Sequence, residues 1–280
     1  MTVATKVTVR QSLLGSADKC LRSFQYSLER PKGFQEGGSI QRSLGTGYHN
    51  GGMEPFYKAL MLGHPVPTID DSVALALTEM HDDIAKADPE NFKWSKEITD
   101  VDAADLKLAS MVRTYFEEEH YWPEDFKVLG VEHTFDFPYM VYGQPVHGTM
   151  DLVLEDPLGY IVIVDHKTCG RMWDSTKHKP RKQNQPAFYT RVAKLIWPDR
   201  PGYRFVYDIM SYAGKFERRI SDPTEAHEQA VWDKAEQLVA LYKMMRGSGL
   251  DLPVNPSSTL CSPAFCDFWP VCPQGEALDN

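Results

Sequence analysis

The chain has 280 residues, of which 42% are hydrophobic and 11% aromatic, so it is not a disordered protein and can form one large globular domain or two small ones. Its net charge of −9 argues against binding nucleic acid through overall charge, so any such contact must come from a local basic patch. The N-terminus lacks an apolar signal segment, and no stretch approaches the ~20 apolar residues that span a bilayer, which predicts a cytoplasmic protein.

The first part of the chain, residues 1–126, is predicted to be mainly helical. Apolar and aromatic residues recur at helical spacing in four segments, at residues 9–28, 45–62, 71–85 and 103–120. The first segment ends before Pro31, as expected of a helix, and a glycine-rich loop at residues 33–38 follows it.

From residue 127 the hydrophobic period changes to two, which predicts strands. The predicted strands are residues 128–137, 146–155, 160–167, 203–212 and 215–220, and the predicted helices are residues 183–196 and 222–246. We expect an α/β fold in a single domain of residues 1–280, with a mixed central sheet flanked by helices at 127–246 and a cysteine-rich tail at 247–280 closing onto it.

Two aspartates and a lysine mark the ends of neighbouring predicted strands. A hairpin brings Asp151 close to Asp165, and Lys167 points to the same face as Asp165 because side chains alternate along a strand. Two close carboxylates repel each other unless a cation lies between them, and such oxygen ligands suit Mg²⁺ or Mn²⁺. A metal that activates water, beside an ammonium group, supplies what phosphodiester hydrolysis needs.

An ordinary exposed ion pair between Asp165 and Lys167 is the alternative, because D-x-K also occurs by chance. The preceding residues, 160–164, form a strand that is apolar on both faces, so the chain leaves a buried sheet at Asp165. This context favours a functional site.

Three motifs in order carry a resemblance to a known family: G-T-x-D at residues 148–151, D-x-K-T at 165–168 and Q-x-x-x-Y at 185–189. The array resembles the RecB branch of the PD-(D/E)XK nucleases, including the AddB and CRISPR-associated Cas-four exonucleases. The resemblance runs from Ser12 to Cys272 and is weakest between Gly63 and Glu124. It implies a restriction-endonuclease-like fold and a divalent-metal-dependent deoxyribonuclease.

The resemblance also implies roles for single residues. Residues 45–49 resemble the family helix that contributes a metal-binding histidine, and Glu132 lies where the family has an acid on its first core strand. The implied metal ligands are His49, Asp151, Asp165 and the backbone carbonyl of His166; the implied catalytic residues are Asp151, Asp165, Lys167, Gln185 and Tyr189. Lys167 would position the nucleophilic water, while Gln185 and Tyr189, one helical turn apart, would support the site and contact DNA.

Three cysteines, Cys261, Cys266 and Cys272, lie in the irregular tail. In the same family a distant cysteine in a C-x-x-x-F site joins three such cysteines to hold a [4Fe-4S] cluster, and Cys20 matches that site. The first gap in the tail is two residues longer than the family's, and a structural Zn²⁺ on four thiolates is the alternative. Cys169 has no place in either scheme.

A basic run separates the D-x-K motif from the Q-x-x-x-Y motif, and its predicted DNA-binding residues are Lys177, Lys179, Arg181 and Lys182. A solvated loop is the alternative. The nearby aromatic residues Trp173, Phe188 and Tyr189 could stack on unpaired bases, or belong to the core.

The resulting hypothesis is an exonuclease acting on single-stranded DNA or DNA ends. The sequence has no nucleotide-binding P-loop, so a helicase motor would be a partner protein. The alternatives are a DNA-end-binding adaptor in recombination or CRISPR spacer acquisition and, third, a zinc-binding structural protein, which would leave the D-x-K and Q-x-x-x-Y motifs unexplained.

Overall fold

The computed structural model describes residues 7–34, 37–173, 183–263 and 265–279. The chain divides into two compact units. The terminal unit comprises Met1–Glu36, Thr134–Gly148 and Glu225–Asn280, and the central unit comprises Gly37–His133 and Thr149–Thr224. Each is described separately below, and the single-domain organisation stays a prediction.

The helical layer of the central unit contains α3 (Ile40–Thr46), the π-helix η1 (Gly47–Met53), α4 (Glu54–Leu62), α5 (Ile69–Lys86) and α6 (Val101–Glu117). The predicted helix at residues 45–62 therefore begins earlier, at residue 40, and passes through a π-helical stretch.

Short polar side chains fix where these helices begin. Ser39 accepts a hydrogen bond from the backbone N–H of Arg42 at 3.3 Å, and Asp100 accepts one from Ala103 at 2.8 Å. Thr68 and Asp71 form a reciprocal capping box at the start of α5. These caps satisfy backbone donors that the first helical turn leaves without partners.

One five-stranded sheet has the order β1 (Lys127–Val141), β2 (Gln144–Glu155), β3 (Ile161–Cys169), β4 (Tyr203–Ser211) and β5 (Phe216–Ser221). Strands β3 and β4 are parallel, whereas β2–β3 and β4–β5 are antiparallel, so the sheet is mixed. Helix α7 (Asn184–Ile196) connects β3 to β4.

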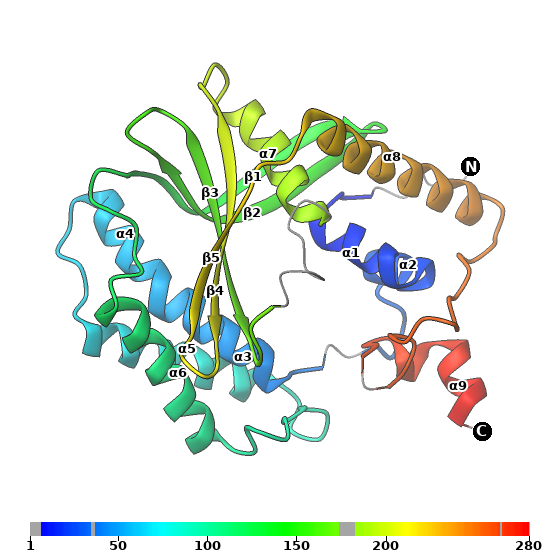
Figure 1. Cartoon of the computed structure of the whole chain (residues 1–280). Coiled ribbons are helices and arrows are strands. Elements are labelled where there is room, and N and C mark those ends of the chain that lie inside the picture. Colours follow the sequence, from blue (N-terminus) through cyan, green and yellow to red (C-terminus); the bar gives the residue numbers. More distant parts are fainter. Residues whose placement is uncertain (1–6, 35–36, 174–182, 264, 280) are drawn as a thin grey trace. The chain divides into compact units, whose positions relative to one another are not determined.

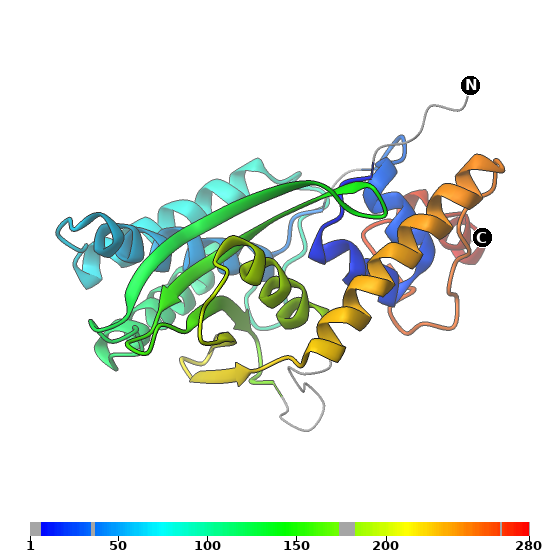
Figure 2. The ribbon, with the colours of Figure 1, turned by 90° about the horizontal axis from the view of Figure 1, so that it is seen from above.

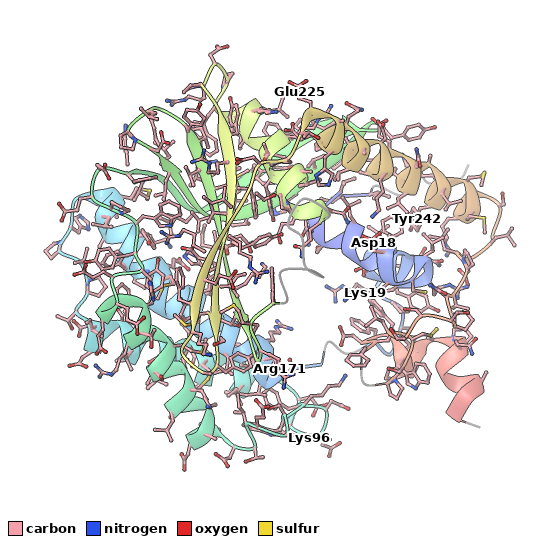
Figure 3. The ribbon with its side chains drawn as sticks, in the orientation of Figure 1. Asp18, Lys19, Lys96, Arg171, Glu225 and Tyr242 are labelled. Carbon is pink, nitrogen blue, oxygen red and sulfur yellow. The ribbon has the colours of Figure 1, made fainter. Side chains whose placement is uncertain are left out.

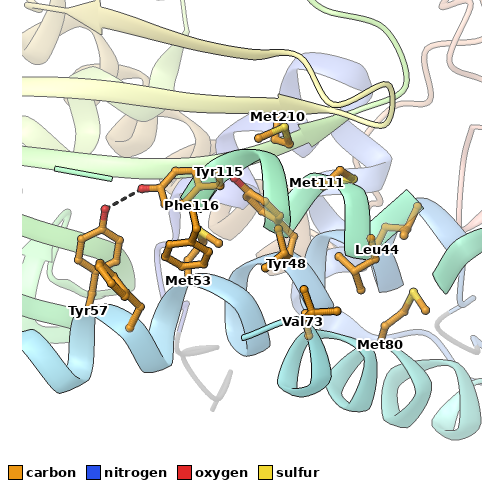
Figure 4. Packing of buried hydrophobic residues seen from close by; sticks show 14 of the residues in the cluster. Leu44, Tyr48, Met53, Tyr57, Val73, Met80, Met111, Tyr115, Phe116 and Met210 are labelled. Atoms are coloured by element: carbon orange, nitrogen blue, oxygen red, sulfur yellow. Dashed lines mark hydrogen bonds between the residues drawn. The ribbon is translucent and has the colours of Figure 1, made fainter. Parts of the chain in front are cut away.

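The main core of the central unit lies between the helical layer and one face of the sheet. Alternate strand residues such as Leu152, Val164 and Val206 are fully buried against α3–α6. The side chains that meet them from the helices are shown in Figure 4. Helix α7 packs on strands β3 and β4 from the opposite face, as the two views in Figures 1 and 2 show. Helices on both faces are expected for a sheet with parallel strands.

The terminal unit contains α1 (Gln11–Lys19), α2 (Leu21–Glu29), α8 (Glu225–Gly247), the short 3-10 helix η3 (Trp269–Val271) and α9 (Pro273–Asp279). The side chain of Asp18 on α1 pairs with Lys234 on α8, and Tyr242 donates a hydrogen bond to Glu29 at 3.0 Å; Asp18 and Tyr242 are labelled in Figure 3.

The tail folds onto α2 within this unit. Arg22 Nε donates to the carbonyl of Leu252 at 2.6 Å, and the Leu252 N–H donates to Gln25 at 2.7 Å. The ring of Phe268 contacts Tyr26 and Phe34, with centroid distances of 5.6 and 4.5 Å. The α/β fold class, the helical N-terminal part and the cysteine-containing C-terminal tail, which here packs on α2, are thus confirmed.

No helix among the described residues combines the length and the apolar character needed to cross a membrane.

Candidate active site

The pairing of strands β2 and β3 ends next to two carboxylates. The antiparallel register runs from Glu155 opposite Ile161 to Leu152 opposite Val164. Asp151 and Asp165 lie directly beyond this last pair, at the point where the pairing of β2 with β3 ends. Asp151 Oδ2 accepts a hydrogen bond from the backbone N–H of His166 at 2.9 Å, which fixes its carboxylate beside β3.

His49 reaches this place from the π-helix η1. A Cβ added to Gly51 would lie 2.4 Å from the backbone of Ala76, so only glycine permits this close contact of η1 with α5. His49 Nε2 lies 3.1 Å from Glu132 Oε1 and 3.7 Å from Asp151 Oδ2. π-helical turns occur often at functional sites, and here one carries the histidine.

Glu132 sits in an unusual backbone conformation within β1. Its φ of +48° lies in the left-handed region, which costs energy for a residue with a side chain. Burial raises the pKa of its carboxyl, the charge of His49 opposes this, and the charge of Asp151 adds to it. The structure thus places Glu132 beside His49, on the first strand, where the resemblance implied an acid.

Asp165 is buried and is held from two sides. Lys167 Nζ lies 2.5 Å from its Oδ2, and Gln185 Nε2 on α7 donates to its Oδ1 at 2.5 Å. Burial raises the pKa of Asp165 to about 6, against the lowering effect of Lys167 and with a further increase from Asp151. Burial alone would lower the pKa of Lys167, but the two carboxylates raise it, so this amine stays charged.

Tyr189 lies one turn after Gln185 on α7, and its ring is parallel to that of Phe205, with a centroid distance of 6.3 Å. Burial, and then the charges of Asp165 and Asp151, raise the pKa of Tyr189, so it stays a neutral hydroxyl. Phe188 is completely buried, so its ring belongs to the core and is not available to stack on a base.

Two polar residues that the sequence did not single out support Gln185. Tyr207 on β4 donates to Gln183 Oε1 at 2.7 Å and lies 3.4 Å from Gln185 Oε1. Tyr207 pairs with Asp165 across the parallel ladder. Neighbours in register share a face of the sheet, so the β3–β4 register was the signal that could have identified Tyr207.

The ring of His166 lies on the opposite face of β3 from Asp165. It is buried among the helices, with centroids 5.7 Å from His49, 6.2 Å from Tyr57 and 6.4 Å from Tyr115. Burial, followed by the charge of His49, lowers the pKa of His166 to about 3, so its imidazole is neutral. Nitrogen atoms of His49 and His166 and a carboxylate oxygen of Asp151 lie within 4.8 Å of one another, close enough to hold one metal ion.

The four predicted cluster cysteines come together in the terminal unit. Cys20, Cys261, Cys266 and Cys272 line a cavity of about 620 Å³. Cys20 has an extended backbone that breaks the predicted helix at residues 9–28 into α1 and α2, and its Sγ accepts a hydrogen bond from the N–H of Asn255 at 3.3 Å. Cys169 lies on β3 in the central unit and is not among the residues that line this cavity.

The predicted DNA-binding residues Lys177, Lys179, Arg181 and Lys182 lie outside the described residues. Trp173 comes just before them, and the centroid of its ring lies 5.3 Å from that of Tyr207, the residue on β4 that pairs with Asp165.

Comparison with known proteins agrees with this architecture. Residues 11–273 match the PD-(D/E)XK nuclease superfamily. The structure is similar to that of a "Putative exonuclease" from Eubacterium rectale, with a TM-score of 0.51 and 11% identity over 92% of this chain and 86% of that chain. At this identity the likeness concerns the fold alone.

A second solved structure, of the protein SSO0001, gives a TM-score of 0.33 and 16% identity over 94% of each chain. The comparison with curated proteins gave no match. The family match extends over nearly the whole sequence and includes the strand ends that carry Asp151, Asp165 and Lys167, and the chain therefore belongs to the PD-(D/E)XK nuclease superfamily.

Proposed function

We propose that this protein is a divalent-metal-dependent DNA exonuclease that hydrolyses phosphodiester bonds on single-stranded DNA or at DNA ends. The observation that carries the proposal is the meeting of Asp151, Asp165 and Lys167 where β2 and β3 separate, with His49 beside them. A nuclease fold that had lost its activity would be expected to lose one of these groups first.

The residues present fit a divalent metal. His49 Nε2 and Asp151 Oδ2 lie 3.7 Å apart, close enough for both atoms to contact one ion. In the proposed site His49, Asp151, Asp165 and the backbone carbonyl of His166 hold Mg²⁺ or Mn²⁺. When bound, such an ion lowers the pKa of a water molecule and neutralises phosphate charge.

The remaining residues position the reactants. Lys167 stays an ammonium because two carboxylates raise its pKa, so it can orient an attacking hydroxide or stabilise the charge that develops on phosphate. Gln185 holds the carboxylate of Asp165 in place, and the hydroxyl of Tyr207 donates to Gln185 Oε1 at 3.4 Å. Tyr189, on the same helical face as Gln185, is placed to contact the DNA strand.

One comparison supports exonuclease action, and the charge pattern of the sequence supports DNA binding. The solved structure from Eubacterium rectale carries the name of an exonuclease. The basic residues 177, 179, 181 and 182 lie in the sequence between Lys167 and Gln185, so they can give local attraction to DNA in a protein of net charge −9. Cooperation with a helicase in DNA repair or recombination, or with a CRISPR protein, belongs to the same proposal.

The decisive experiment is cleavage of end-labelled single-stranded and double-stranded DNA with Mg²⁺ or Mn²⁺. Lys167→Met removes the ammonium and keeps most of the side-chain volume, so we expect a loss of at least about 100-fold in rate, in the range of general electrostatic contributions. Lys86→Met, at the exposed end of α5, is the matched control and should cleave normally.

Cleavage that needs metal and is lost only in Lys167→Met would support the nuclease. A folded protein that binds DNA ends and never cleaves them would favour the adaptor function instead. Normal cleavage by Lys167→Met would remove this lysine from the mechanism.

We further propose that Cys20, Cys261, Cys266 and Cys272 hold a [4Fe-4S] cluster. The support for this proposal is that all four thiols line one cavity. A structural Zn²⁺ on the same four thiolates is the alternative, because zinc is also bound by four cysteines.

A further inference from the structure

The side chain of His166 is a buried polar group to which the proposed mechanism gives no role. The proposed mechanism uses only its backbone, and yet the ring is buried, with a side chain that points away from Asp165 and Lys167. Neither ring nitrogen has a hydrogen-bond partner among the described residues. Buried polar atoms of this kind cost free energy unless a partner is supplied, and they are rare in native proteins.

The rings around His166 hold it in place and offer it no acceptor. Tyr57 and Tyr115 bond to each other through their hydroxyls at 2.6 Å, and their rings lie about 6 Å from His166. The same two tyrosines are labelled in Figure 4, where the bond is drawn as a dashed line. His49 and Asp151 are the polar neighbours that could share a metal ion with His166, because their ligand atoms lie within 4.8 Å of a His166 nitrogen.

We propose that an imidazole nitrogen of His166 is itself a metal ligand, so that the site binds Mn²⁺, or a similar transition-metal ion, in preference to Mg²⁺. This inference rests on the proposed function, since it concerns the ion used by the same site. It assigns a role to the side chain at the middle position of the D-x-K motif, where the mechanism needs only a peptide carbonyl.

The selectivity follows from the chemistry of the ligands. Mg²⁺ prefers oxygen ligands in a strict octahedron and holds its water molecules strongly, whereas Mn²⁺, a first-row transition-metal ion, binds carboxylates equally well and accepts imidazole nitrogen more readily than Mg²⁺ does. A second imidazole beside His49 raises the affinity for Mn²⁺ and adds little for Mg²⁺. Occupation by a metal also gives one buried His166 nitrogen the partner that the described residues do not supply.

His166→Phe tests this inference with little change in shape. The phenyl ring fills the same space among Tyr57 and Tyr115 and removes both unpaired nitrogens, so the metal-free variant should be at least as stable as the natural protein. His166→Asn is the second variant, in case the phenyl ring disturbs folding. His81→Asn is the matched control, because His81 is an exposed histidine on α5 that pairs with Asp105.

The first readout is pulsed electron paramagnetic resonance of bound Mn²⁺, which counts the imidazole nitrogens attached to the ion. We expect two in the natural protein and in His81→Asn, and one in His166→Phe and His166→Asn. The second readout is the metal-induced rise in Tm. The rise caused by Mn²⁺ should shrink in the His166 variants, with at least a tenfold loss in Mn²⁺ affinity, while the smaller rise caused by Mg²⁺ should remain.

The outcomes separate this inference from the proposed function. Two nitrogens that fall to one in the His166 variants establish the ligand. One nitrogen in all proteins, with Mn²⁺ bound, overturns the inference and leaves the nuclease proposal standing. Failure of the natural protein to bind Mn²⁺, with DNA cleavage retained in Mg²⁺, overturns the inference alone, and failure to bind or use either ion overturns both.

Discussion

The surroundings of Asp165 determine the pKa of its carboxyl group, and this pKa decides when the carboxylate is available to a metal. It is buried, accepts hydrogen bonds or ion-pair contacts from Gln185 and Lys167, and lies near the negative charge of Asp151. Burial raises its pKa to about 6, above the ordinary value of about 3.9. The carboxylate form is therefore costly in the metal-free protein at neutral pH.

This raised pKa predicts a definite pH dependence. The contribution of Asp165 to stability is complete below about pH 4 and is lost as the pH rises through about 6, because the unfolded carboxyl ionises first. We expect Asp165→Asn, which resembles the protonated form, to gain about 2 kcal/mol relative to the natural protein between pH 4 and pH 7.5 when both are metal-free.

Urea unfolding in the presence of a chelator at several pH values measures this difference. The metal affinity of the natural protein should change in the opposite direction, rising as the pH passes 6, because metal and proton compete for the same carboxylate. Asp136→Asn, on β1, serves as a control for the loss of one aspartate. A stability difference that is independent of pH would contradict the burial argument.

At the scale of elements, the π-helix η1 brings His49 to the strand ends. Its glycines allow the backbone of η1 to lie directly against α5. Gly51 contacts the backbone of Ala76. A backbone segment within a helix cannot move aside, whereas the end of a flexible side chain can. The conformation of η1 is therefore imposed by its packing.

Gly51→Ala tests this dependence. The added methyl group would lie 2.4 Å from the Ala76 backbone, so we expect η1 to shift, with a loss of about 1–3 kcal/mol in the free energy of unfolding. The metal affinity should also fall, because His49 moves with the helix.

Gly15→Ala is the control, since a Cβ at this position of α1 meets no described atom within 4 Å. Alanine is the better helix former, so this change should stabilise the protein by up to about 1 kcal/mol. Denaturant unfolding and Mn²⁺ titration of both variants measure the two effects. Equal behaviour of the two variants would show that the close packing of η1 has no role.

The elements that the sequence predicted well are those whose pattern is local. Strand β3 is a continuous apolar run that ends in the D-x-K motif, and the predicted strand at residues 160–167 matches its limits, Ile161–Cys169, to within two residues. Helices α5 and α6 carry regular apolar faces and polar caps, and they begin within two residues of the predicted positions.

The features that the sequence did not predict depend on contacts between distant residues. The apolar spacing at residues 9–28 continues across Cys20, so the sequence predicts one helix. The structure divides it into α1 and α2 at Cys20, next to the segment of α2 on which the distant tail packs. Alternation along β3 predicts that His166 faces away from Asp165, but the cage of tyrosines around its ring comes from α4 and α6. The support of Gln185 by Tyr207 likewise requires the β3–β4 register.

At the scale of the whole molecule, the thiols that line one cavity belong to opposite ends of the chain. Cys20 lies near the N-terminus, and Cys272 lies near the C-terminus, within a tail that has little regular structure. A cross-link between such distant segments restricts the unfolded chain strongly, and metal–thiolate bonds add their own folding energy. The proposed cluster should therefore raise the free energy of unfolding of the terminal unit by more than the side-chain contacts around the four cysteines provide.

Cys20→Ser tests the cluster through colour, metal content and stability together. In protein purified without oxygen we expect the natural chain to be brown and to contain about four iron atoms, as a [4Fe-4S] cluster requires. Cys20→Ser should lose both iron and colour and should unfold at a lower temperature. Cys169→Ser is the matched control, because Cys169 lies on β3, in the other unit, and should change neither property. A colourless natural protein that contains zinc would replace the cluster by a four-thiolate zinc site, whereas loss of iron in Cys169→Ser as well would mean that the wrong four cysteines have been chosen.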